Sequence, residues 1–330
     1  MTKIVFMGTP DFAVPSLTAL ISAGYAIAAA VTQPDRPQGR KRELAPPPVK
    51  IVAERHGIPV LQPERIRDPE AVDAIRKLAP DLIVTAAYGQ ILPKALLDLP
   101  RLGCINVHGS LLPKYRGGAP IQHALMNGEE KTGVTIMYMA EGLDTGDMIS
   151  KIEVPIGIED DAGTLFDKLS AAGADLLVRT LPDLIAGRIR AVPQNDAEAT
   201  YARTLTRDDE RIDWSAPALT VYNRIRALRP RPGAYTLLGG ETLKIWRALP
   251  PAEPSEGGGE NAPDGSAGAS TAVPGTVLKV LPAFIEVAAG DGPIRLTEVQ
   301  PAGKKAMPVA DFINSGRIKP GMILGGGERA

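Results

Sequence analysis

The first half of the sequence alternates between continuous apolar runs of strand length and segments with helical periodicity. Helical patterns of apolar residues occupy 13–23, 49–56 and 71–78. Continuous apolar strands separated by helices predict a mainly parallel sheet, because such a sheet is covered on both of its faces. We therefore expect an open, Rossmann-like α/β domain over residues 1–189. Its predicted strands lie at 3–7, 26–32, 81–87, 103–107 and 132–139.

The pattern changes toward the second half of the chain. Residues 162–187 predict one or two helices, the polar and irregular stretch 190–208 predicts a linker, and residues 216–228 predict a further helix. Several short strands with Gly and Pro turns between them favour a small β-barrel, which we expect over residues 209–330. The strand candidates lie at 234–238, 241–246, 275–280, 284–288 and 294–299.

A low-complexity stretch interrupts this second domain. Residues 251–274 hold four acidic and no basic residues, a composition typical of a flexible, solvated insertion. Residues 201–330 contain 16 Lys and Arg against 14 Asp and Glu, so that without the four acids of the insertion the counts are 16 and 10. The rest of the domain is therefore net basic by about six charges. Ordinary scatter of surface charge explains these counts equally well.

Several classes of protein are excluded by what the sequence lacks. Cys104 is the single cysteine, so neither an internal disulfide nor a cysteine-based metal cluster is expected. The turn after the first strand, residues 8–13, has one glycine where a dinucleotide fingerprint needs three. No apolar stretch approaches about 18 residues, and the start shows no signal-peptide pattern. A cytoplasmic protein without a membrane partner is the expectation. The formal net charge of −1 excludes a uniformly basic nucleic-acid binder.

Polar side chains at the end of one apolar strand mark the candidate site. Asn106 and His108 are two residues apart, so in a strand they lie on the same face. Two polar groups on a central strand are costly unless they are used or hydrogen-bonded. Ligands bind at the carboxyl ends of the strands in open α/β sheets, so we favour a functional site over a structural His–Asn pair.

A histidine that acts as a base commonly has a carboxylate beside it. Asp144 and Asp147 follow the strand at 132–139, and we expect them at the same edge of the sheet as His108, where either could reach it. The Gly- and Pro-rich loop at 110–120 follows His108 directly. It holds Lys114 and Arg116, two cations that could meet an anionic ligand.

Two of these motifs together resemble the 10-formyltetrahydrofolate-dependent formyltransferases. The motifs are NVHGSLLP at 106–113 and GLDTG at 142–146. Further motifs resemble the branch of that family that acts on methionyl initiator tRNA, and they are GTPDF at 8–12, TQPDRP at 32–37 and QPAGKK at 300–305. The resemblance spans essentially the whole chain, and the insertion at 251–274 touches no motif.

The resemblance implies transfer of a formyl group from 10-formyltetrahydrofolate to the α-amine of methionyl initiator tRNA, without a metal. It implies that His108 acts as base and donor, that Asn106 hydrogen-bonds the oxyanion, and that Asp144 orients His108 and takes part in proton transfer. A monomer is expected. The folate contacts implied are Tyr88, Gly89, Ile91, Ser110, Leu111, Leu112 and Pro113.

The resemblance also gives the second domain an OB-like barrel, a fold suited to nucleic acids. Together with the basic charge, it implies that this domain binds tRNA. The loop at 34–48 is longer than the usual connection of about 2–6 residues, and the resemblance favours a tRNA contact there over an ordinary surface loop. The tRNA-binding residues implied are Arg36, Arg40, Lys41, Arg42, Lys304 and Lys305.

Other functions are also compatible with the same residues. A formyltransferase with a sugar-nucleotide or glycinamide-ribotide acceptor, or a formylfolate hydrolase, would share Asn106, His108 and Asp144. The basic loop at 33–42 and the basic second domain favour tRNA over these acceptors. A non-catalytic tRNA-binding protein is the alternative from another class, and the intact set of three catalytic residue types argues against it.

Overall fold

The computed structural model of the chain describes residues 2–38, 43–251 and 272–326. Its residues gather into two compact units, which we describe separately. The first unit comprises Met1–Pro120, Lys131–Pro155 and Leu165–Arg203. The second comprises Ile121–Glu130, Ile156–Thr164 and Thr204–Ala330, so it takes two short stretches from the first half of the chain.

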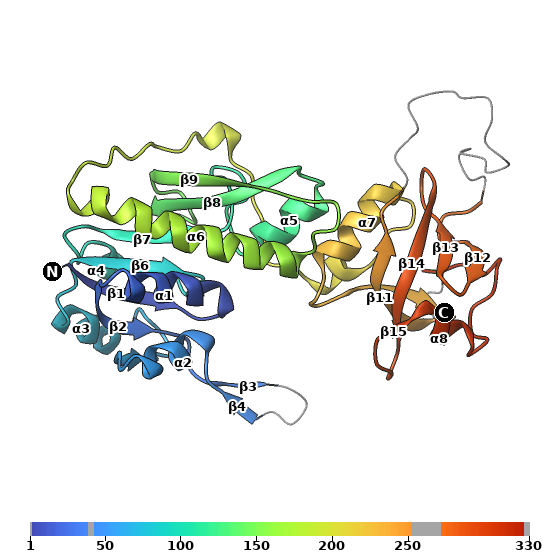
Figure 1. Cartoon of the computed structure of the whole chain (residues 1–330), viewed down its shortest axis with the longest axis horizontal. Helices are drawn as coiled ribbons and strands as arrows, with labels where there is room; N and C mark the ends of the chain where they lie inside the picture. Colours follow the sequence, from blue (N-terminus) through green and yellow to red (C-terminus); the bar gives the residue numbers. More distant parts are fainter. Residues whose placement is uncertain (1, 39–42, 252–271, 327–330) are drawn as a thin grey trace. The chain divides into compact units, whose positions relative to one another are not determined.

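A seven-stranded sheet forms the centre of the first unit (Figure 1). Five strands run parallel to their neighbours, and the last two are antiparallel. The predicted mainly parallel α/β sheet is thereby confirmed. In spatial order the strands are β5 (Val60–Leu61), β2 (Ala26–Val31), β1 (Lys3–Gly8), β6 (Leu82–Ala86), β7 (Cys104–His108), β8 (Lys131–Tyr138) and β9 (Met148–Pro155).

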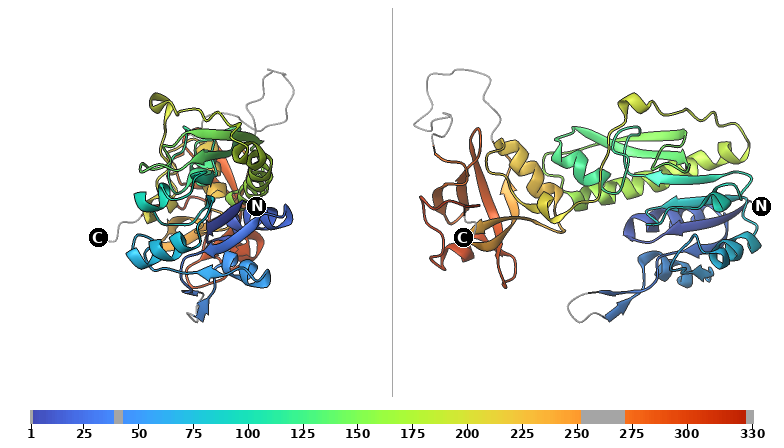
Figure 2. Two further views of the ribbon diagram at one scale, coloured as in Figure 1. Left: turned by 90° about the vertical axis from the view of Figure 1, so that its left-hand side faces the viewer. Right: turned by 180° about the vertical axis from the view of Figure 1, so that it is seen from behind.

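Helices cover both faces of this sheet, as Figure 2 shows from two further sides. On one face, the Phe12 ring packs edge-on against Phe166 of α6 (Ala162–Ile185), with centroids 5.1 Å apart. A Cβ added to Gly173 of α6 would lie 2.8 Å from Val107, so α6 packs closely on β7. The helices and short 3₁₀ turns of the remainder are η1 (Asp11–Ala13), α1 (Val14–Ser22), α2 (Pro48–Arg55), α3 (Pro69–Lys77), α4 (Lys94–Leu97) and η2 (Asp196–Glu198).

The opposite face packs against α3 and α4. Its apolar cluster joins Val72 and Ile75 of α3 and Leu96 of α4 to strand residues that include Val5, Ile83 and Cys104. Because side chains alternate along a strand, Asn106 and His108 of β7 lie on the same face as Cys104, away from α6. The candidate site therefore opens on the α3–α4 side of the sheet.

A short hairpin, β3 (Arg36–Gln38) with β4 (Glu43–Ala45), projects from the first unit (Figure 1). It occupies the long connection after β2 that the sequence left without regular structure. Arg40, Lys41 and Arg42, three of the expected tRNA contacts, lie outside the described residues. The expected flexible insertion at 251–274 also falls almost wholly outside them.

The second unit contains an antiparallel sheet with the strand order β10-β11-β14-β13-β12, and β15 pairs with β14. Residues 321–325 hydrogen-bond to both edge strands: the Val277 N–H donates to the Met322 carbonyl, and the Gly325 N–H donates to the Leu237 carbonyl. This segment closes the sheet into the expected small barrel. The strands are β10 (Ala234–Leu238), β11 (Glu241–Leu249), β12 (Val277–Leu281), β13 (Phe284–Ala288), β14 (Pro293–Pro301) and β15 (Met307–Pro308).

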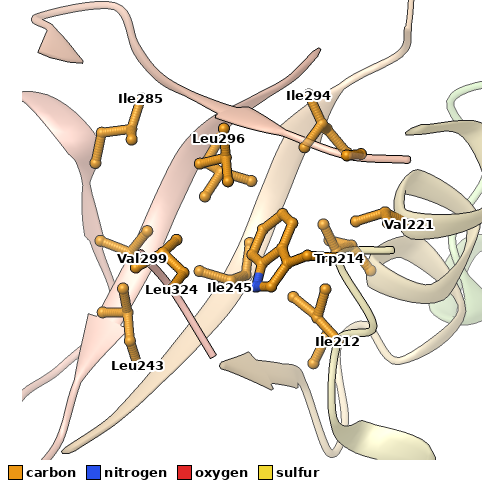
Figure 3. Close-up of a cluster of buried hydrophobic side chains, with 14 of the residues drawn as sticks. Ile212, Trp214, Val221, Leu243, Ile245, Ile285, Ile294, Leu296, Val299 and Leu324 are labelled. Atoms are coloured by element: carbon orange, nitrogen blue, oxygen red, sulfur yellow. The ribbon is translucent and has the colours of Figure 1, made fainter. Parts of the chain in front are cut away.

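One apolar core holds the second unit together, and its centre is shown in Figure 3. Trp214 lies among Ile245, Leu296 and Val221, and its indole N–H donates to the Thr236 hydroxyl at 2.9 Å. Burying this large ring with its only polar group hydrogen-bonded avoids an unpaired donor in the core. The helices of the unit are α5 (Pro120–Met126), which begins one residue before it, η3 (Arg207–Glu210), α7 (Ala218–Ala227) and α8 (Val309–Ile313).

Across the described part of the chain, no helix is both long and apolar enough to cross a bilayer.

Candidate active site

His108, at the end of β7, is held by the loop that follows it. Its Nε2 atom lies 3.1 Å from the Tyr115 carbonyl oxygen, and its Nδ1 atom lies 3.7 Å from Oδ2 of Asp144. A carbonyl oxygen only accepts hydrogen bonds, so Nε2 carries a proton. In the neutral ring, Nδ1 is then the basic nitrogen, and it faces the Asp144 carboxylate. With 6% of its surface exposed, the imidazole is largely shielded from bulk water.

Asp144 lies in the 139–147 loop in an unusual backbone conformation. Its φ of +52° is in the left-handed region, which non-glycine residues rarely adopt. Its Oδ2 accepts the Gly117 N–H at 2.8 Å, so the same oxygen that faces His108 is already hydrogen-bonded to the backbone. Asp147 is exposed and is the other carboxylate that the sequence offered. The geometry therefore favours Asp144 as the partner of His108.

The reason given from the sequence for this proximity was wrong. β8 runs antiparallel to β7, with His108 opposite Thr135 and Ile105 opposite Tyr138. The carboxyl end of β8 therefore lies beside the start of β7, away from His108. Asp144 reaches the histidine because the 139–147 loop folds back over the face of the sheet. A methionine sulfur in this loop, Met139 Sδ, lies 3.3 Å from the Thr85 hydroxyl on that same face.

Asn106 is partly exposed beside His108 and is oriented by β6. The Thr85 hydroxyl lies 2.8 Å from Asn106 Oδ1 and 3.1 Å from the Ile105 carbonyl oxygen, and the contact with Asn106 is the shorter of the two. An amide whose oxygen accepts from a neighbour presents its NH₂ group as a donor elsewhere. Asn106 thereby offers a fixed hydrogen-bond donor on the face that also holds His108.

The segment 110–113, expected to contact folate, is pinned to the strands beneath it. The Thr135 hydroxyl donates to the Ser110 carbonyl and accepts the Leu112 N–H, and Lys151 Nζ donates to the Leu112 carbonyl at 2.7 Å. The side chains of Ser110 and Leu112 are buried, and the Ser110 hydroxyl donates to the Lys114 carbonyl. Only Leu111 and Pro113 present partly exposed side chains.

The segment that follows β6 contains both buried and exposed side chains. Tyr88 is 4% exposed, its hydroxyl has no hydrogen-bond partner, and burial raises the pKa of this phenol to about 12. Its carbonyl accepts hydrogen bonds from Thr9 and Gln33. Gly89 has a φ of +92°, which turns the chain so that Ile91 is 79% exposed. Tyr88, one of the expected folate contacts, is therefore too deeply buried to present its side chain to a ligand.

Lys94 of α4 contacts the 139–147 loop. Its Nζ lies 3.6 Å from a carboxylate oxygen of Glu141. Two apolar side chains of these segments are exposed, Ile91 before α4 and Leu143 in the loop.

Arg116 is not the ligand-facing cation that its position in a Gly- and Pro-rich loop predicted. Its side chain is 2% exposed, with Nε donating to Gln194 and Nη2 to Asp196. These partners come from 190–208, the expected linker. That segment continues to bond to the loop, since the Arg116 N–H donates to the Thr200 carbonyl and the Ala202 N–H donates to the Arg116 carbonyl. Gln194 belongs to no periodic pattern or motif by which it could be found from the sequence.

Among the expected tRNA contacts that are described, all three are exposed. Arg36 lies 3.5 Å from Glu64, and Lys304 and Lys305 occupy the turn after β14. Nowhere in residues 2–38, 43–251 and 272–326 do three or more His, Cys, Asp or Glu side chains gather as metal ligands would.

Comparison with known proteins accounts for both units. A family model described as formyl transferase matches residues 2–181, and a model for the formyl transferase C-terminal domain matches residues 204–317. The chain belongs to the formyl transferase family. The resemblance inferred from the motifs at 106–113 and 142–146 is thereby confirmed.

The relatives of this formyl transferase match it over its full length. Methionyl-tRNA formyltransferases from Geobacillus thermodenitrificans and Bacillus velezensis are 55% and 54% identical to it, each over 98% of both chains. The fold is shared with a Helicobacter canadensis N-formyltransferase solved with folinic acid and dTDP-3-aminofucose, at 18% identity and a TM-score of 0.61, covering 90% of this chain and 98% of that one. It is also shared with HypX from Aquifex aeolicus in complex with tetrahydrofolic acid, at 16% identity and a TM-score of 0.62, over 96% of this chain. The alignment spans about half of HypX, 47% of its chain.

Proposed function

We propose that this protein transfers the formyl group of 10-formyltetrahydrofolate to the α-amine of methionyl initiator tRNA. The observation that carries the proposal is the end-to-end match, at 54–55% identity, to methionyl-tRNA formyltransferases. The arrangement of Asn106, His108 and Asp144 supports it, because an amide donor, a base and a carboxylate on one face suit acyl transfer to an amine.

In the proposed reaction the amine nitrogen attacks the formyl carbon and forms a tetrahedral oxyanion. Asn106, whose amide oxygen is occupied by Thr85, donates from its NH₂ group to the oxyanion. A donor in this role is typically worth about 3 kcal/mol of transition-state stabilisation. The bond between the formyl carbon and the folate nitrogen then breaks, and the formyl group remains on the amine.

His108 carries the proton in this scheme. The proton that the amine loses passes to Nδ1, the nitrogen left free by the bond from Nε2 to Tyr115, and is returned to the leaving folate nitrogen. Asp144, 3.7 Å from Nδ1, stabilises the imidazolium in between. A free aminoacyl α-amine loses its proton readily near neutral pH, so a strong activating device for the nucleophile is not required.

The folate site is proposed beside Asn106, between the loop after β6 and the 139–147 loop. Exposed Ile91 and Leu143, and the main chain at Gly89, offer apolar and backbone surface for a flat heterocycle. Leu111 and Pro113 are retained as contacts. Ser110, Leu112 and Tyr88 act behind this surface, because their side chains are buried.

The tRNA is proposed to contact the hairpin β3–β4 and the second unit. Arg36 supplies positive charge at the hairpin, Arg40, Lys41 and Arg42 follow it in the sequence, and exposed Lys304 and Lys305 supply positive charge on the barrel. Phosphate contacts of this kind give affinity without reading the sequence. As proposed domains we keep a catalytic domain over 1–189 and a tRNA-binding barrel over 209–330.

A transfer assay with competing acceptors tests the proposal. The protein is given 10-formyltetrahydrofolate with methionyl initiator tRNA, methionyl elongator tRNA or a dTDP-amino sugar. We expect formylation of the initiator tRNA alone. Transfer to the amino sugar, or hydrolysis of the donor without an acceptor, would replace the proposed acceptor by one of these alternatives.

A further inference from the structure

Gln194 hydrogen-bonds the backbone at the candidate catalytic carboxylate and two residues beyond it. Its Nε2 atom donates to the Asp144 carbonyl at 2.7 Å and to the Gly146 carbonyl at 2.8 Å. Both protons of the amide are therefore used on the 139–147 loop.

The chemistry of its neighbours fixes which end of the Gln194 amide faces the loop. Its Oε1 accepts from Arg116 Nε at 3.0 Å. A guanidinium only donates, and the two carbonyls only accept, so a rotated amide would meet donor with donor and acceptor with acceptor. The three partners together thus determine the orientation of the Gln194 amide.

The loop needs such support because of its own conformation. Asp144 is in the left-handed region, which residues other than glycine adopt uncommonly. Gly146 is packed so closely that a Cβ would lie 1.9 Å from the Tyr138 carbonyl oxygen, so the loop cannot relax in that direction. Backbone in sparsely populated conformations persists only when its surroundings determine it.

Arg116 holds the Gln194 side chain in place. Its buried guanidinium also pairs with Asp196, and its main chain hydrogen-bonds to Thr200 and Ala202. The chain from 194 to 202 is therefore fastened to the loop that supplies both the Tyr115 carbonyl and the Gly117 N–H. The Tyr115 carbonyl, the Gly117 N–H and the Gln194 amide, which contact His108 and Asp144, therefore belong to one hydrogen-bonded assembly.

We propose that Gln194 is a positioning residue for the reaction, holding Asp144 at its distance from His108. The inference rests on the proposed function and deepens it. Gln194 itself contacts neither ring nor carboxylate, so it acts through the Asp144 backbone. A displacement of about 1 Å in a reacting group costs on the order of 10²-fold in rate.

The test uses two variants of Gln194 with different chemistry. Gln194→Glu keeps an oxygen for Arg116 but has no N–H for the loop, and Gln194→Ala removes both. We expect both to lower kcat on the order of 10²-fold, with KM for the formyl donor and for tRNA within about threefold of wild type. Asn195→Ala is the matched control, since within the described part of the chain the Asn195 side chain hydrogen-bonds to Ala197 and Glu198 of its own exposed turn. We expect it to have wild-type kinetics.

A double-variant cycle separates positioning from a general loss of structure. Residues that act as one unit are non-additive, so Gln194→Ala added to Asp144→Asn should lower kcat little beyond Asp144→Asn alone. Multiplicative losses, or wild-type kcat in Gln194→Glu, would overturn the inference while wild-type transfer to initiator tRNA upheld the proposed function. Absence of transfer by the wild-type protein would instead remove the proposed function.

Discussion

The imidazole of His108 is oriented by a main-chain carbonyl, that of Tyr115, 3.1 Å from Nε2. Tyr115 has a φ of +61°, and its N–H donates to the Thr200 hydroxyl at 2.9 Å. The backbone conformation that presents this carbonyl is thus held by a residue far along the chain. Asp144 meets the other ring nitrogen at 3.7 Å, which is longer than a hydrogen bond, so the Tyr115 carbonyl makes the closer contact with the ring.

Removing the donor should lower kcat strongly, and removing the base should abolish transfer, while the fold persists in both variants. Asn106→Ala is expected to lower kcat by about 10²–10³-fold, the usual cost of an oxyanion donor. We expect His108→Ala to leave no measurable transfer. Steady-state kinetics with a thermal midpoint for each variant measure both effects, and His56→Ala, at an exposed histidine, is the control. Near-normal kcat in either site variant would remove the proposed mechanism.

The two aspartates near the end of the 139–147 loop form a matched pair. Asp144→Asn keeps the size of the side chain but removes the charge facing His108, so we expect a large loss of kcat with little change in KM for the formyl donor. Asp147→Asn alters an exposed side chain and should have wild-type kinetics. A larger effect of the change at Asp147 would show that the wrong carboxylate has been assigned.

The Tyr88 hydroxyl gives a prediction about stability. It is buried without a hydrogen-bond partner, and an unpaired buried hydroxyl carries a desolvation cost of about 1–3 kcal/mol. Tyr88→Phe removes it, so we expect unchanged or higher free energy of unfolding in urea and unchanged kcat. Destabilisation by more than about 1 kcal/mol would mean that the hydroxyl has a partner in solution.

Glu286 in β13 makes the stability of the second unit depend on pH. Burial alone would raise its pKa, but hydrogen bonds from Arg295 and Lys279 outweigh burial and hold the pKa below its ordinary value. A carboxyl with a lowered pKa stabilises the fold above its unfolded pKa, about 4.3, and loses that contribution as pH falls through the folded pKa.

We therefore expect Glu286→Gln to be less stable than wild type at pH 7, by about 1–2 kcal/mol, and the difference to shrink below about pH 4. Urea unfolding at both pH values measures it. Glu298→Gln is the control, because its partner Arg247 is largely exposed and such surface pairs contribute about 0–1 kcal/mol. A difference that stayed constant with pH would argue against a charged Glu286.

The tRNA contacts predict a change in salt dependence. Neutralising Lys304 and Lys305, or Arg40, Lys41 and Arg42, should raise KM for tRNA and flatten its dependence on salt by roughly one counterion per lost contact. Affinity for the formyl donor should stay unchanged in both variants. A salt titration of tRNA affinity, with folate affinity measured alongside, checks this. Equal slopes in wild type and variants would make these ordinary surface charges.

Local patterns in the sequence predicted the elements well and their pairing less well. Continuous apolar runs indicated β1, β2, β6, β7 and β8, and alternating short strands indicated the barrel. The reversal of β8 was missed, because an apolar run does not record its direction and β9, whose exposed positions alternate, gave no such run.

The site could be predicted where chemistry and motif coincide, as at Asn106 and His108. The residues that support the site could not be predicted. Gln194 acts through carbonyl oxygens that every residue possesses, and the buried Arg116 pairs with an exposed aspartate 80 positions away. Contacts of this kind depend on the tertiary fold, so residue type and spacing do not reveal them.

Arg226 in α7 shows how the second unit would respond to being cut out. Its buried guanidinium donates to the carbonyls of Gly157 and Asp160, and Tyr222 donates to that of Ile158. A fragment beginning at 204 would leave this cation with the Asn223 side chain but without its carbonyl acceptors at 157–160. A chimaera between relatives would therefore need residues 156–164 and the barrel from the same parent. The second unit cannot be exchanged by joining two sequences at one position.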